Sequence, residues 1–387
     1  MHVVVEVLWF VVGVAVVLAV ADSALRTFVL PRGVAPPLTR GVFATLRAAF
    51  DAAAGVCRTY DGRDAVMALY APIVLLVLPL VWLMLVIGAF TAIFHALGVS
   101  GFEHAFEMSG SSMFTLGFVR PPDLATTTVA FVEATIGLAL LALLIAYLPT
   151  IYAAFSRREI LVAQLAARSS DPTGVSILVR AQEMERFDLL GDLWVGWQVW
   201  FAELEETHTS LGILSFFRSP RAHRSWVTSC GAILDAASLR LSAVDRPFDP
   251  QAGLCVRSGF VALQAVAEYF HLPFDPDPRP TDPISIAREE FDDACERLAA
   301  AGIPIRADRD QAWRDFNGWR VNYDRALLGL AGLLMVPYAQ WSSDRSPRTR
   351  RHVGRGHVGR GHVGRGHLGR GFRTANAPDD PDPRRGG

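Results

Sequence analysis

The sequence predicts an all-α membrane protein, with three transmembrane helices followed by an α-helical cytoplasmic domain. Hydrophobic residues make up 51% of the 387 positions, and the mean hydropathy is positive, at +0.28. Soluble domains are usually less apolar, and here the excess lies in the first 155 residues. The rest of the chain alternates apolar positions at helical spacing with breaks such as LPFDPDPRPTD at 273–283. We therefore expect a membrane part and a helical domain.

Three apolar stretches are long enough to cross a bilayer, at residues 3–21, 65–97 and 126–155. A helix rises about 1.5 Å per residue, so about 20 residues span the roughly 30 Å hydrocarbon core. Each stretch contains at most one acidic residue. Residues 1–21 are assigned as the first transmembrane helix. A cleaved signal peptide is the alternative, because Ala-Val-Ala at 19–21 resembles a cleavage site, although no arginine precedes the apolar run.

Arginine distribution predicts the orientation of the spans. The segment 22–64 contains six arginines, whereas 98–125 contains one. Arginine is enriched in cytoplasmic loops, so 22–64 is predicted to be a cytoplasmic amphipathic linker. The N-terminus and the 98–125 loop then lie outside, and the C-terminus is cytoplasmic. These features predict a multi-pass protein of the plasma membrane whose first partner is the lipid bilayer.

The 98–125 loop predicts a short helix followed by an extended segment. Residues 102–113 (FEHAFEMSGSSM) can form a helix with Phe102, Phe106 and Met113 on one side. The sequence TLGF follows at 115–118, and two prolines at 121 and 122 favour an extended exit. Irregular backbone is tolerated at membrane depth only where protein or a water-filled cavity surrounds it. This order therefore predicts a re-entrant loop between the second and third spans.

The loop resembles the filter of the potassium-channel pore-domain family. Thr115, Leu116, Gly117 and Phe118 are similar to the Thr-Val-Gly-Tyr part of that filter, and 131–148 (FVEATIGLALLALLIAYL) resembles the inner helix. The resemblance covers residues 65–156 and implies a homotetramer that passes a monovalent cation such as K⁺. In that family backbone carbonyls replace the hydration shell of the ion, so the carbonyls of these four residues are the implied ligands.

Three positions depart from the family pattern. Phe114 stands where the family has the first threonine of a pair, Val119 where it has the second glycine, and Arg120 where it has an acidic residue. A β-branched residue resists the positive φ that such a filter needs. Four guanidinium groups at the pore mouth would oppose cation entry unless Glu103, Glu107 or Asp123 paired with them. Strict potassium selectivity is therefore not implied.

Three residues of the third span are assigned to filter support and gating. Glu133 is predicted to bind Ser111, Ser112 or backbone near the filter, with a protonated carboxyl packed between helices as the alternative. Gly137 lies where the resembling family often has a hinge glycine. Pro149 removes a backbone donor and should bend the helix near a gate. A bend that only fits neighbouring helices is the alternative.

Residues 157–344 are predicted to form one helical domain. Trp194, Trp197 and Trp200 form a stripe that indicates a helix core, with a helix lying on the membrane as the alternative. His208 is expected on a solvated helix face. A group of basic and aromatic residues is expected to pack through ion pairs, with an anionic ligand as the alternative: Arg314, Trp319, Arg320 and Tyr323.

No catalytic, cofactor or metal motif is evident, so we expect neither an enzyme nor a bound cofactor or metal. The four cysteines show no ligand spacing. Residues 345–387 contain the repeat HVGRG and are predicted to be a disordered tail that could touch anionic lipid or nucleic acid or loosely capture metal. A functionless repeat expansion is the alternative. The net charge of −1 is close to balanced and identifies no partner, and we expect no nucleic-acid partner for the protein.

These features together favour an ion channel-like membrane protein with a tetrameric pore for monovalent cations. A non-conducting membrane receptor or scaffold that keeps the pore fold for assembly is the alternative hypothesis. Conduction and assembly both depend on how the 114–120 segment is held.

Overall fold

The computed structural model describes residues 2–28, 36–169, 172–187 and 190–345. Within these ranges the chain forms helices, and the single extended pairing is an isolated bridge between Val244 and Ile305. The predicted all-α fold is confirmed for this part of the chain. The tail predicted to be disordered lies outside the described residues from 346 onward.

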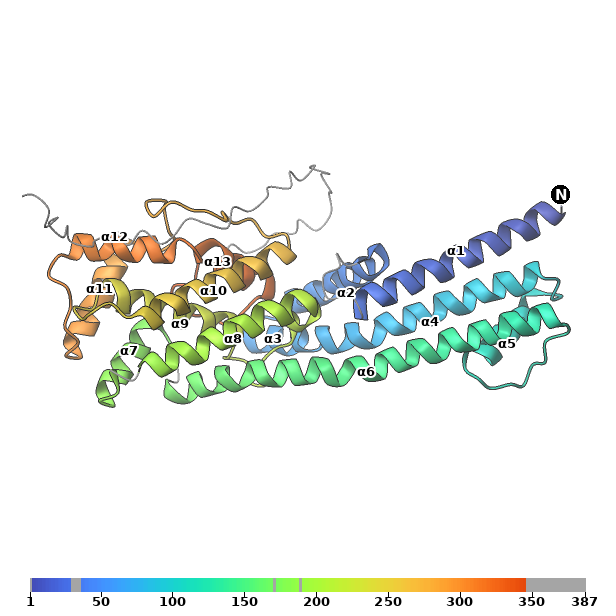
Figure 1. Ribbon diagram of the computed structural model, residues 1–387, viewed down its shortest axis with the longest axis horizontal. Coiled ribbons are helices and arrows are strands. Elements are labelled where there is room, and N and C mark those ends of the chain that lie inside the picture. The colour runs from blue at the N-terminus through green and yellow to red at the C-terminus, as the bar shows by residue number, and fades with distance from the viewer. Residues whose placement is uncertain (1, 29–35, 170–171, 188–189, 346–387) are drawn as a thin grey trace, which may run out of the picture. The chain divides into compact units, whose positions relative to one another are not determined.

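Three of the described helices are long and apolar enough to cross a membrane: α1 (His2–Phe28), α4 (Tyr70–Ala96) and α6 (Leu124–Arg168). Helix α4 packs along α1 and also contacts α6 (Figure 1). At Gly13 the two helices are so close that an added Cβ would lie 2.7 Å from the Ala89 carbonyl oxygen. Small residues permit this close approach between apolar helices.

Two spans are longer than predicted. Helix α1 was expected to end at residue 21 but continues to Phe28, because Ser23 is buried between neighbouring helices. The Ser23 hydroxyl lies 2.9 Å from the Thr39 hydroxyl and accepts from the Trp82 indole N–H at 3.2 Å. Helix α6 was expected to end near 155 but continues to Arg168. The predicted linker 22–64 contains α2 (Pro37–Val56) and most of α3 (Tyr60–Ala68).

The C-terminal helical region surrounds α9, which is buried along nearly its whole length. Its hydrophobic core also takes in Val162 and Leu165, so the far end of α6 packs with this region. The predicted boundary between residues 156 and 157 falls inside α6. The elements are α7 (Gly174–Glu183), α8 (Leu190–Ser210), the 3-10 helix η2 (Gly212–Phe216), α9 (Trp226–Ser242), α10 (Pro250–Tyr269), α11 (Arg288–Ala300), α12 (Arg309–Arg320) and α13 (Asp324–Leu334).

Aromatic and charged residues complete this core. The stripe of Trp194, Trp197 and Trp200 on α8 is buried, which confirms the core interpretation. Arg320 forms ion pairs with Asp235 and Asp324 and is fully buried. Burial opposes its charge, but the two carboxylates outweigh that effect and raise the pKa of Arg320. Packing through ion pairs is therefore confirmed for Arg320.

Candidate functional site

Helix α5 (Phe102–Met113) forms the first half of the candidate pore loop and packs against α4 and α6 (Figure 1). The helix predicted at 102–113 is confirmed. The expected common face is wrong, because Phe102 and Phe106 are exposed whereas Met113 is buried. Met113 is buried because α6 crosses there with Gly137, whose missing side chain leaves room for it.

The segment after α5 turns its N–H groups back onto the end of that helix. The N–H groups of Leu116 and Gly117 donate to the Ser111 carbonyl oxygen at 2.8 and 3.4 Å. The Val119 N–H donates to the Ser111 hydroxyl at 3.2 Å. Thr115 has a φ of 55° and Gly117 a φ of 69°, so two alternate residues adopt the left-handed region.

The carbonyl groups of residues 115–118 differ from the N–H groups in their hydrogen bonding. Among the described residues, no hydrogen bond to the carbonyl oxygens of residues 115–118 is formed. Residues 115–118 are all exposed, including the large side chains of Leu116 and Phe118. A segment that leaves its carbonyl groups free while most of its N–H groups are hydrogen-bonded is suited to binding a cation.

Glu133 lies behind α5 and is fully buried, at 0% exposure. The predicted partners Ser111 and Ser112 are wrong: the carboxyl Oε1 lies 2.5 Å from the hydroxyl of Ser109, one turn earlier on α5. That hydroxyl also lies 3.1 Å from the Ile87 carbonyl oxygen on α4. A hydroxyl has one proton, so both contacts are satisfied when Glu133 donates to Ser109 and Ser109 donates to Ile87. Glu133 thus links three helices.

Gly137 is a close-packing position. A Cβ built there would lie 2.6 Å from the Met113 carbonyl oxygen and 2.9 Å from its sulfur. Helix α6 continues without interruption through both Gly137 and Pro149. Pro149 lies on an exposed part of the helix, twelve residues beyond Gly137.

The acidic residues that could neutralise Arg120 lie close to it in sequence. Arg120 is exposed, and neither Glu103, Glu107 nor Asp123 pairs with it in the described part of the chain. Glu107 faces His104 at 3.6 Å, and Asp123 caps the start of α6. The N–H of Thr126 donates to Asp123 and lowers the pKa of its carboxyl.

The sequence did not indicate the long-range contacts of Arg158. It lies on the extension of α6 and is buried. Its guanidinium donates to the carbonyl oxygens of Leu214 at 2.9 Å and Phe217 at 2.7 Å, and it contacts the His208 ring at 3.2 Å. The expectation of a solvated His208 is wrong, since this residue is fully buried. Burial, followed by the charge of Arg158, holds the pKa of His208 well below its usual value.

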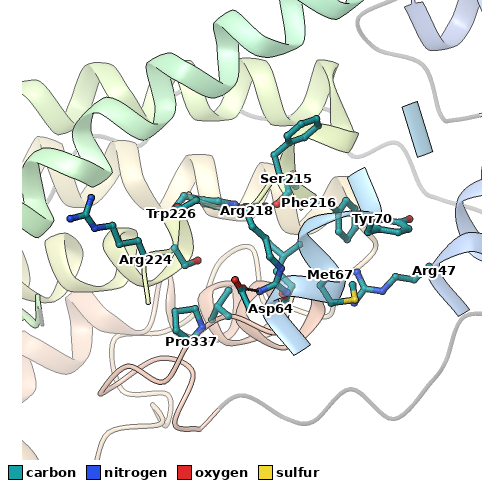
Figure 2. Close-up of a pocket in the computed structure, with 15 residues that line it drawn as sticks. Arg47, Asp64, Met67, Tyr70, Ser215, Phe216, Arg218, Arg224, Trp226 and Pro337 are labelled. Carbon is teal, nitrogen blue, oxygen red and sulfur yellow. Dashed lines mark hydrogen bonds and ion pairs between the residues drawn. The ribbon is translucent and has the colours of Figure 1, made fainter. Parts of the chain in front are cut away.

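Arg218 follows η2 and links two further elements. Its guanidinium pairs with the Asp64 carboxylate of α3 at 2.5 Å and donates to the Leu334 carbonyl oxygen of α13 at 2.6 Å (Figure 2). The segment 211–218 therefore binds both α6, through Arg158, and the helix that precedes α4, through Asp64. The only sequence signal for this arrangement was the presence of arginine, because every partner is distant along the chain.

Comparison with models of protein families, with curated proteins and with solved structures found no match. The functional argument therefore depends on the geometry of this chain.

Proposed function

We propose that this chain is an ion channel-like membrane protein that passes monovalent cations through a homotetrameric pore formed by residues 115–118. The observation that carries the proposal is the one-sided hydrogen bonding of this segment. The N–H of Thr115 donates to the Ser112 carbonyl oxygen, and those of Leu116 and Gly117 donate to the Ser111 carbonyl oxygen. The carbonyl oxygens of Thr115, Leu116, Gly117 and Phe118 have no donor among the described residues. Carbonyl rings from four chains would replace the hydration shell of a cation.

The end of α5 supports a cation at the same place. A helix C-terminus carries partial negative charge from its last carbonyl groups. Helix α5 ends at Met113, directly before the segment with free carbonyls. Both the helix and the segment therefore favour positive charge there. Arg120 acts in the opposite direction, so we propose a cation pore without strict potassium selectivity.

The exposed side of α6 supports assembly in a bilayer. Between residues 131 and 148 its large exposed side chains are apolar: Phe131, Val132, Leu138, Leu141, Ile145 and Leu148. In a plasma membrane this surface would face lipid or neighbouring copies. We propose a multi-pass topology with the N-terminus outside and the C-terminus in the cytoplasm, where the C-terminal helical region would lie.

Planar-bilayer recordings of the purified full-length protein test conduction. Gly117→Ala should abolish cation current, because alanine at a φ of 69° is strained and displaces the neighbouring carbonyls. Gly110→Ala is the matched control, since a Cβ at Gly110 meets no atom within 4 Å. Arg120→Asp should increase cation current by removing positive charge from the mouth. Equal currents from all three variants would place the conduction path elsewhere.

A non-conducting receptor or scaffold is the second candidate, and Arg120 is the observation that favours it. An unpaired guanidinium beside the proposed entrance opposes cation entry. Intact tetramers, measured by cross-linking, that show no current at any voltage would support this candidate over the channel.

Cysteine labelling tests the proposed topology. Thr45→Cys and His104→Cys introduce single exposed thiols on opposite predicted sides of the membrane. Cys57 should first be changed to serine because it is the partly exposed native cysteine, whereas Cys230, Cys255 and Cys295 are buried. An impermeant reagent on intact cells should label residue 104 alone. Labelling of residue 45 alone would reverse the orientation.

A further inference from the structure

A small cavity lies where α2, α3, the loop after η2 and the end of α13 meet (Figure 2). Its volume is about 20 Å³. Figure 2 shows Arg218 extending across the centre toward Asp64, with Arg224 and Arg47 on either side. A cavity of this size has room for one or two particles as large as a water molecule.

Two hydroxyl groups in the cavity wall have no partner in the described part of the chain. Ser215 is 2% exposed and Ser219 is 8% exposed, and both line the cavity. Neither side-chain oxygen forms a hydrogen bond among the described residues. The Nη1 atom of Arg47, which also lines the cavity, is buried and unpartnered as well. Buried polar atoms are usually satisfied, so three at one cavity indicate a bound polar species.

The charges around the cavity favour an anion. Three guanidinium groups line it, from Arg47, Arg218 and Arg224. Asp51 pairs with Arg47 at 2.8 Å, and Asp64 pairs with Arg218. These two arginines also donate to carbonyl oxygens at the end of α13, from Leu333 to Met335. Three positive and two negative side chains leave a formal excess of one positive charge.

We propose that this cavity binds one halide ion, with the hydroxyl groups of Ser215 and Ser219 as donors and the arginines as its electrostatic environment. A serine hydroxyl can rotate to donate to an anion. The volume suits a monatomic anion, and one negative charge balances the arginine excess. The ion would stabilise the contact of α2 and α3 with the C-terminal helical region by mass action. This site does not depend on whether the protein conducts.

Thermal unfolding of the full-length protein in detergent tests the proposal, with sodium chloride exchanged for sodium gluconate at constant ionic strength. Chloride and bromide should raise Tm in a saturable manner. The double variant Ser215→Ala/Ser219→Ala should raise the half-saturating chloride concentration by about tenfold or more, because hydrogen bonds to a charged group are lost. Ser242→Ala is the control: this buried serine donates to the Ser238 carbonyl oxygen at 2.7 Å and is remote from the cavity wall. It should lower Tm equally in both salts.

Equal Tm values in chloride and gluconate would overturn the proposal and leave water as the occupant. An unchanged chloride response in the double variant, or a response to phosphate but not chloride, would also overturn it. If the double variant does not fold, anomalous diffraction from crystals grown in bromide decides: a peak between Ser215 and Ser219 is expected, and its absence contradicts the site.

Discussion

Gly137→Ala provides a direct test of how the candidate pore loop is held. An alanine Cβ would lie 2.6 Å from the Met113 carbonyl oxygen, whereas ordinary contacts begin at 3.4 Å, so the two atoms must separate by about 0.8 Å (3.4 − 2.6). Overpacking of this kind costs about 1–3 kcal/mol. The higher helix propensity of alanine returns about 0.5–1 kcal/mol. We therefore expect a net destabilisation of about 1–2 kcal/mol.

Detergent-based thermal unfolding and bilayer current measure the two consequences of this substitution. Tm should fall, and current should fall with it, because only Phe114 separates Met113 from the residues that supply the carbonyl groups. Gly88→Ala is the matched control on α4, where a Cβ meets no atom within 4 Å, and it should leave both unchanged or raise Tm slightly. A Gly137→Ala protein with normal Tm and normal current would refute the close-packing argument.

Substitutions at three further positions probe the buried polar groups and the α1–α4 contact. Glu133→Gln should keep the free energy of unfolding within about 1 kcal/mol, because a neutral amide can also donate to the Ser109 hydroxyl, which lies 2.5 Å from Oε1. Glu133→Ala should lower it by about 2 kcal/mol or more in chemical unfolding. A large loss from glutamine would contradict the protonated carboxyl that donates to Ser109. Because the pKa of His208 is depressed in the folded protein, the unfolded state binds more protons than the folded state just below pH 6.5. The free energy of unfolding is therefore highest above that pH and falls by about 1.4 kcal/mol per pH unit below it. His208→Gln should remove this slope in unfolding curves from pH 5 to 8, and a slope that persists would exclude His208 as its cause. Gly13→Leu should separate α1 from α4 and lower Tm, and an unchanged Tm would show that this contact does not contribute.

The membrane helices were predictable because their signal is local. A continuous apolar stretch of sufficient length identifies a span without knowledge of its neighbours. The prediction that the third helix ends near residue 155 was wrong, because the arginines at 157 and 158 do not end the helix, which continues to Arg168. Arg158 is instead buried, and its guanidinium donates to the carbonyl oxygens of Leu214 and Phe217, which lie more than 50 residues away in sequence. A local sequence pattern does not predict hydrogen bonds between an arginine and carbonyl oxygens so distant in the chain.

The candidate site was predicted at the level of its segment but not of its contacts. Helix 102–113 followed from apolar spacing, yet the spacing does not determine which face meets α6. The partner of Glu133 was therefore placed at Ser111 or Ser112, whereas the structure selects Ser109 and uses Ser111 to hold the loop. The buried His208 was missed for a related reason, because polar neighbours such as those around it usually indicate solvent exposure.

The fixed points on α6 limit where this helix can bend. Gly137 is held against Met113 at one end, and Arg158 is held by the segment 211–218 at the other. Pro149 lies between them and cannot donate the backbone hydrogen bond of a regular helix turn. A bend near Pro149 therefore breaks the fewest backbone hydrogen bonds of the helix. Such a bend would also alter the packing of Tyr147 and Ile151, which belong to a buried cluster with residues of α4. Because Gly137 is packed closely against Met113, we consider Pro149 the stronger candidate for a hinge in α6.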